Sequence, residues 1–140
     1  MLDIKKTLAK LLKCDYVIAE GDSGEWSYRK WSNGRIEAWA THAFGSQTGT
    51  AWGGQYYKDM TLPLPSGLFS SAPKIYAVSA NQSWVVYGAS ATTSSISLRL
   101  LRNASNAAAM TINFYVVGGV ACRLLKALKT LTLERGWLYA

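Results

Sequence analysis

Residues 26–39 read Trp-Ser-Tyr-Arg-Lys-Trp-Ser-Asn-Gly-Arg-Ile-Glu-Ala-Trp, and this is the most informative stretch of the chain. Asn33-Gly34 between two aromatic-rich runs predicts a β-hairpin, because Asn-Gly supplies the two positive φ angles of a type I′ turn. With a two-residue loop, Lys30 would face Glu37, and Tyr28 would face Trp39. The same alternation predicts one face with Trp26, Tyr28 and Trp39, and another with Trp31, Ile36, Ala38 and Ala40.

Aromatic or aliphatic bulk on both faces of the hairpin is more than a lone two-layer domain can cover. We therefore expect a subunit interface or a ligand surface to cover the second face. The cross-strand partners are mostly architectural in this interpretation, so the hairpin aromatics are expected to hold the domain together rather than to contact a ligand.

The composition describes one globular β-rich domain of 140 residues with six Trp, eight Tyr, twelve Gly and three Pro. The net charge of +7 divides into +2 for residues 1–15, +2 for 16–117 and +3 for 118–140, so the centre is close to balanced. No apolar run reaches about eighteen residues and no secretory signal precedes the domain, so we expect synthesis in the cytoplasm and no membrane insertion. Cys14 and Cys122 are interpreted as small buried hydrophobes, and we predict no metal site.

The centre of the chain predicts an all-β fold, an antiparallel and jelly-roll-like sandwich. In residues 95–102 and 109–117 apolar and polar residues alternate, and the turn-rich segment between them predicts a second hairpin with one inner face. Short β-rich runs separated by turn residues give eight candidate strands: 16–20, 26–31, 36–43, 55–62, 74–80, 83–88, 95–102 and 109–117.

Both ends of the chain show apolar residues at helical spacing, which predicts short amphipathic helices in an N-terminal segment 1–15 and a basic tail 119–140 flanking the head domain 16–118. Ile4, Leu8 and Leu11 form the first stripe, which would pack on its own domain or in a bundle with sister chains. The pattern does not distinguish between these two packing arrangements.

The chemistry-bearing residues favour binding over catalysis. His42 is the single histidine and no Gly-x-Ser-x-Gly elbow accompanies it, so we predict no enzyme and no cofactor. Glycan binding needs exposed aromatic rings beside amide or acid groups. Two groupings offer this chemistry, namely Trp52, Gln55, Tyr56 and Tyr57, and Asn81, Gln82, Trp84 and Tyr87.

The run from Tyr28 to Trp39 resembles the Trp-Ser-Asp/Asn-Gly-x-x-Glu-x-Trp-Gly signature of C-terminal head domains in bacteriophage and prophage tail fibres. Matching landmarks follow in Leu62-Pro63-Leu64-Pro65-Ser66-Gly67-Leu68-Phe69, in Ala72-Pro73 and in the closing run 111–118, so the resemblance covers roughly 17–118. The family's Gly after the second Trp is Ala40 here, and the tail beyond Gly118 departs from the family.

The resemblance implies a β-sandwich head that forms a homotrimer on a stalk, works with other tail proteins in the virion tail, and recognises a bacterial surface glycan or protein receptor. It would place Ile4, Leu8 and Leu11 on the stalk axis. The alternative is a small basic domain that binds single-stranded nucleic acid. Its best support is the run of aromatic and basic residues Trp26, Tyr28, Arg29, Lys30 and Trp31. The nearly neutral centre weighs against nucleic acid.

Overall fold

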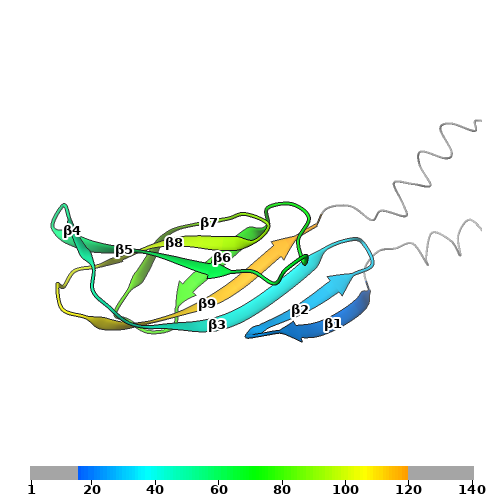
Figure 1. Ribbon diagram of the computed structural model, residues 1–140, viewed down its shortest axis with the longest axis horizontal. Helices are drawn as coiled ribbons and strands as arrows, with labels where there is room; N and C mark the ends of the chain where they lie inside the picture. Colours follow the sequence, from blue (N-terminus) through cyan, green and yellow to red (C-terminus); the bar gives the residue numbers. More distant parts are fainter. Residues whose placement is uncertain (1–15, 120–140) are drawn as a thin grey trace, which may run out of the picture.

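A computed structural model describes residues 16–119, which form two stacked antiparallel sheets (Figure 1). The five-stranded sheet has the order β1-β2-β3-β9-β6 and the four-stranded sheet the order β4-β5-β8-β7. The strands are β1 (Val17–Ser23), β2 (Trp26–Trp31), β3 (Ile36–Gln47), β4 (Thr50–Trp52), β5 (Gln55–Pro63), β6 (Lys74–Ser79), β7 (Val85–Ala91), β8 (Ser95–Arg102) and β9 (Ala108–Gly118).

The β-sandwich is confirmed, but the predicted fold class with flanking helices is corrected. Residues 16–119 contain strands, turns and loops and no helix. The two predicted helical segments, with Ile4, Leu8, Leu11 and both cysteines, lie outside the described residues. Apolar spacing alone was an insufficient basis for the helices, because a short amphipathic stripe depends on a packing partner that the pattern does not identify.

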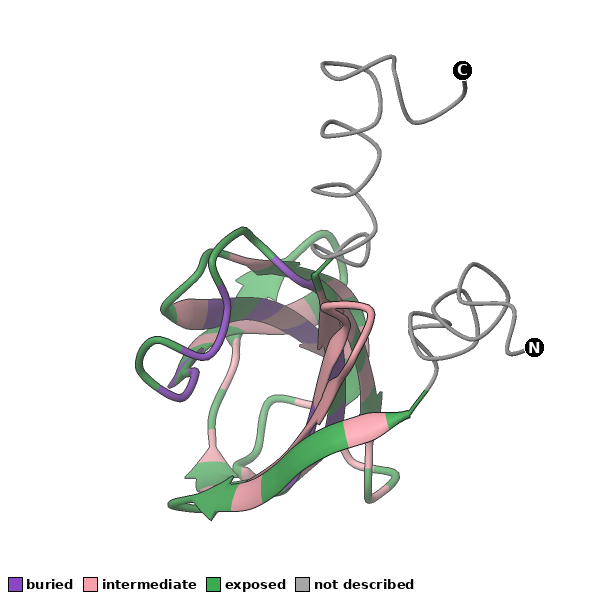
Figure 2. Cartoon of the chain, turned by 90° about the vertical axis from the view of Figure 1, so that its right-hand side faces the viewer, coloured by how far each residue is buried: buried purple, intermediate pink, exposed green. Residues whose placement is uncertain are grey.

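The core lies between the sheets and follows the predicted alternation in β8 and β9. Ile96, Leu98 and Leu100 face Met110, Ile112, Phe114 and Val116 across the interior, and all seven are buried. The loop between β5 and β6 adds buried Leu64, Leu68 and Phe69. Purple segments outside the strands in Figure 2 show that loops also contribute to the core. Removal of this apolar surface from water is the main stabilising contribution to such a fold.

The predicted second hairpin is wrong, because β8 and β9 belong to different sheets. β8 pairs with β5 and β7, whereas β9 pairs with β3 and β6. The turn-rich segment after Arg102 therefore crosses from one sheet to the other. Alternation identifies the inner face of each strand but carries no information about the neighbouring strand.

The hairpin of β2 and β3 exists, but its register is shifted by one residue from the prediction. Tyr28 pairs with Ala38, and Arg29 pairs with Glu37. Trp31 N donates to Arg35 O at 2.8 Å, Gly34 N donates to Trp31 O at 3.0 Å, and Gly34 has a φ of 89°. This is a three-residue loop with a glycine bulge rather than a two-residue type I′ loop.

The additional loop residue also changes the two faces of the hairpin. Trp26 and Tyr28 join Ile36, Ala38 and Ala40 at the core. Trp39 is exposed, and the indole of Trp31 meets Glu37 on the solvent side. The predicted pair of Lys30 with Glu37 does not form, because Lys30 pairs with Ile36.

Within residues 16–119 there is no helix long and apolar enough to cross a membrane.

Candidate functional site

Three aromatic side chains meet on the outer surface of the four-stranded sheet, and we call them the aromatic cluster: Trp52 from β4, Tyr57 from β5 and Tyr87 from β7. The Trp52 ring centroid lies 5.9 Å from that of Tyr57 and 5.7 Å from that of Tyr87, with interplanar angles of 78° and 81°. These edge-to-face contacts fix the ring orientations. Trp52 is 43% exposed and Tyr87 is 63% exposed, so two rings are open to solvent.

An arginine and an aspartate lie beside the aromatic cluster. Arg99 of β8 is the register partner of Asp59 of β5, and its Nε and Nη2 donate to the carboxylate at 2.7 and 2.8 Å. The Arg99 guanidinium carbon is 4.4 Å from the Tyr57 ring centroid and 5.4 Å from that of Trp52. The hydrogen bonds from Arg99 lower the pKa of Asp59, so this side chain is charged at neutral pH.

Strand alternation explains why these residues share one surface. In β5, Tyr57, Asp59 and Thr61 alternate with residues that turn toward the other sheet, and Arg99 alternates with buried Leu98 and Leu100 in β8. The register between β7 and β8 shifts at Tyr87, between Val86 and Gly88. Such bulges redirect a side chain relative to regular alternation.

Two shallow grooves flank the aromatic cluster. The hydroxyl groove, of about 460 Å³, contains Asp59 and Arg99 together with Thr61, Ser90, Ser97 and the small residues Gly88 and Ala89. The amide groove, of about 340 Å³, lies nearer the loops and is lined by Gln55, Gln82, Ser83, Val85, Leu101, Arg102 and Asn103. Leu101 pairs with both Tyr57 and Val85, so the amide groove adjoins the aromatic cluster.

The structure brings the residues of the two predicted groupings together in a different arrangement from the one predicted. Trp52, Tyr57 and Tyr87 meet in the aromatic cluster, and Gln55 and Gln82 meet in the amide groove.

Three of the predicted residues lie elsewhere. Trp84 is 1% exposed, and its Nε1 donates to Ala108 O at 3.2 Å inside the core. Tyr56 is half-buried on the inward side of β5, and Asn81 Nδ2 donates to Ala109 O at 3.1 Å, which ties down its own loop.

Asp59, Arg99, Arg102 and Asn103 were absent from the predicted groupings. Asp59 and Arg99 both occupy outward positions of predicted strands, but they are forty residues apart. The pairing of β5 with β8 brings them together, and no local pattern in the sequence reveals that pairing.

The outer surface of the five-stranded sheet, here the five-stranded outer face, is a second uncovered surface. Register places Trp39, Tyr115 and Tyr76 side by side across β3, β9 and β6, and all three are exposed, as is Val78. A groove of about 590 Å³ between β6 and β7 is lined by Tyr76, Tyr115 and Tyr87 among others, so it joins this face to the aromatic cluster.

Glu37 lies at the centre of a polar network on the five-stranded outer face. Its carboxylate accepts from Trp31 Nε1 at 3.1 Å and from Tyr115 Oη at 2.9 Å, and lies 3.4 Å from Arg35 Nη2. Burial raises the pKa of Glu37, but the two hydrogen bonds and the charges of Arg35 and Arg29 outweigh burial, so the pKa lies below its ordinary value. The same burial and the bond to Glu37 raise the pKa of Tyr115.

Five carboxylates in the described domain each lie beside a neighbouring polar side chain. Glu20 meets Arg29 at 3.0 Å, Asp22 accepts from Ser27 at 2.7 Å, and Glu25 lies 2.7 Å from His42 Nδ1, with Glu37 and Asp59 paired as described. Arg29, one of the basic residues that would support nucleic-acid binding, is thus paired with an acid, as is the neighbouring Arg35. Within residues 16–119 there is no group of three or more metal-ligating side chains.

No family model and no curated protein sequence matches this chain. Two solved structures share its fold. An N-truncated R1-type pyocin tail fibre has a TM-score of 0.57 at 13% identity, with 84% of this chain and 98% of that chain aligned. A C-terminal part of the P. aeruginosa R1 pyocin fibre has a TM-score of 0.57 at 14% identity, covering 84% of this chain and 32% of that chain. The chain therefore has a tail-fibre-like fold.

Proposed function

We propose that this protein is a tail-fibre-like structural component of a phage tail or a related particle, and that it attaches the particle to a bacterial surface receptor without catalysis. The observation that carries the proposal is the exposed aromatic cluster around Arg99 and Asp59 on a fold shared with pyocin tail fibres. Aromatic rings beside a few fixed polar groups are typical of recognition surfaces.

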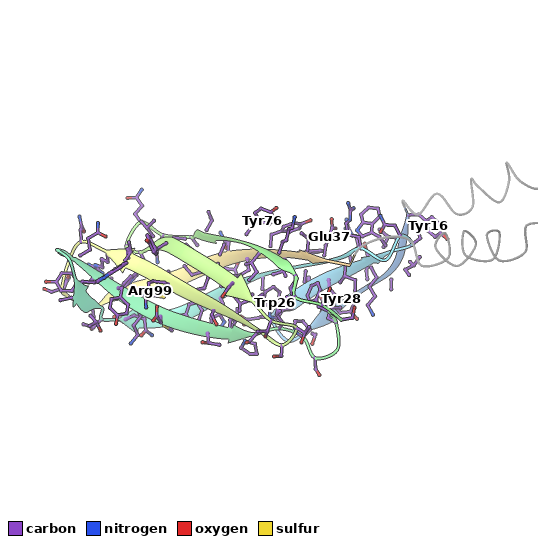
Figure 3. All side chains as sticks on the ribbon, turned by 90° about the horizontal axis from the view of Figure 1, so that it is seen from above. Tyr16, Trp26, Tyr28, Glu37, Tyr76 and Arg99 are labelled. Carbon is purple, nitrogen blue, oxygen red and sulfur yellow. The ribbon has the colours of Figure 1, made fainter. Side chains whose placement is uncertain are left out.

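The position of the aromatic cluster in the molecule supports a role in attachment. Tyr16 and Gly119, the first and last described residues, lie at one end of the sandwich, at the right of Figure 1, and β4 with Trp52 lies toward the other end. Figure 3 shows Arg99 on the half of the molecule away from Tyr16. A head joined to its particle at the first end would present the aromatic cluster outward.

We further propose that the head functions as a homotrimer, in which sister chains cover the five-stranded outer face. The exposed Tyr76, Val78, Trp39 and Tyr115 form an apolar surface of the kind that marks a protein interface. Three identical sites on one rigid assembly convert weak single-site binding into useful avidity.

Two measurements test these proposals on the full chain. Fluorescently labelled protein should bind saturably to some isolates in a panel of bacteria, and absence of binding to every isolate tested would count against receptor attachment. Light scattering after size-exclusion chromatography should give three times the chain mass of 15.3 kDa, whereas a monomer at micromolar concentration would refute the trimer. Tyr76→Ala should weaken the trimer, while Tyr16→Ala, an equally drastic change at an exposed tyrosine, should not.

A further inference from the structure

The aromatic cluster and the hydroxyl groove together have the chemistry of a saccharide site. Trp52 and Tyr87 present open ring surface, and their mutual edge-to-face contact holds that surface in place before any ligand arrives. The apolar face of a pyranose ring can stack on such a surface. Prior orientation of the rings reduces the entropy lost on binding.

The polar groups beside the rings are balanced in charge. Arg99 uses Nε and Nη2 for the two Asp59 oxygens, which leaves further N–H groups on the guanidinium and further lone pairs on the carboxylate. The pair thus offers donors and acceptors side by side. A sugar hydroxyl both donates and accepts, so it matches this pair, whereas an acidic sugar would have to approach the Asp59 carboxylate.

The hydroxyl groove extends the site beyond one ring. It is a shallow groove of about 460 Å³, and Thr61, Ser90 and Ser97 line it with hydroxyl groups. The space above Gly88 is open, since a Cβ atom at that position would meet nothing within 4 Å. A second sugar unit can occupy this space while the first stacks on the aromatic cluster.

Resting on the proposed attachment function, we infer that the receptor is a neutral saccharide of at least two units, bound across the aromatic cluster and the hydroxyl groove with its hydroxyls on Arg99 and Asp59. The paired charges make binding insensitive to salt, because no net charge on the site has to be neutralised by the ligand.

An array of paired neutral and uronic-acid-containing oligosaccharides tests this inference on the full chain. The protein should bind neutral members, and Trp52→Ala should weaken that binding about tenfold, as loss of a central aromatic contact commonly does. Asp59→Asn leaves Arg99 unbalanced, so it should lower neutral binding and raise binding to the acidic members. Unchanged selectivity in Asp59→Asn, or unchanged affinity in Trp52→Ala, would overturn the inference.

Binding to cells treated with periodate or with protease distinguishes a failure of this inference from a failure of the proposed function. If the protein binds cells, periodate oxidation of the surface glycans should abolish the binding and protease treatment should not. Binding that survives periodate and is lost after protease overturns the saccharide assignment alone and leaves receptor attachment standing. Thermal unfolding monitored by circular dichroism confirms that each variant is folded; Asp59 and Trp52 are exposed, so both variants should fold.

Discussion

Replacement of Trp84 by alanine should be among the most destabilising single changes in the described domain. The side chain is 1% exposed, and a buried Trp removes about 150 to 250 Å² from water, worth roughly 4 to 6 kcal/mol at about 25 cal/mol per Å². The change also leaves Ala108 O without the bond from Trp84 Nε1 at 3.2 Å. Measured Trp-to-Ala changes in cores cost about 3 to 5 kcal/mol, and we expect Trp84→Ala in that range.

Urea unfolding at 25 °C, followed by circular dichroism at one fixed protein concentration, measures this loss. The concentration must be held constant because self-association would contribute to apparent stability. Trp52→Ala is the matched control, since it deletes the same side chain from an exposed position, and should cost less than about 1 kcal/mol. A loss below about 1 kcal/mol for Trp84→Ala, or equal losses for the two variants, would refute the assignment of Trp84 to the core.

Three further predictions concern the hairpin, the polar network and the β5–β6 loop. Gly34→Ala should cost about 1 to 2 kcal/mol in urea unfolding, because the φ of 89° disfavours a side chain; an unchanged midpoint would contradict the bulged loop. Because the folded-state pKa of Glu37 is lowered, its carboxylate stabilises the fold at pH values above its unfolded-state pKa of about 4.3, and this stabilisation is lost as the pH falls through the folded-state pKa. Glu37→Gln should therefore make the free energy of unfolding less dependent on pH in the acid range. Parallel curves of stability against pH for the two proteins would argue against the network. Gly118→Ala should lower the melting temperature, because the new Cβ would lie 2.6 Å from Phe69 Cδ1; an equal or higher value would show that Phe69 moves freely.

The inner faces of the strands could be predicted from the sequence because alternation is a local property. Ile96, Leu98 and Leu100 were predicted to face inward and are buried. The sheet to which each strand belongs depends on contacts between residues far apart, and the pattern in β8 and β9 is equally compatible with a hairpin and with opposite sheets.

The hairpin register failed for a different physical reason. Asn-Gly is compatible with both a two-residue loop and a three-residue loop with a bulge, and the two differ by one residue of register. The observed pairing places Arg29 opposite Glu37 and brings the Trp31 indole to the same carboxylate. These tertiary contacts form with the bulged loop. Local turn propensity contains no information about them, so the sequence did not show which of the two loops is favoured.

The candidate site was partly accessible from the sequence. Aromatic residues near amides drew attention to Trp52, Tyr57 and Tyr87, but their meeting requires side chains from β4, β5 and β7 to converge across one sheet. Trp84 has the same local surroundings as a binding aromatic and is buried in the core. Composition does not distinguish a buried Trp from an exposed one. Trp84 lies just before β7, and its burial depends on tertiary contacts such as the bond to Ala108 O at the start of β9.

The central claim, that the aromatic cluster is the surface that attaches to the cell, is tested most directly by one comparison on bacteria. Tyr87→Ala and Tyr16→Ala remove exposed tyrosines, 63% and 53% exposed, from the aromatic cluster and from the opposite end of the sandwich. Flow cytometry of the labelled full chain on a bound isolate should show at least about tenfold weaker binding for Tyr87→Ala, because in the proposed trimer avidity multiplies a loss at each site. Tyr16→Ala should leave the binding unchanged. Wild-type binding by Tyr87→Ala, or equal losses in both variants, would contradict the account.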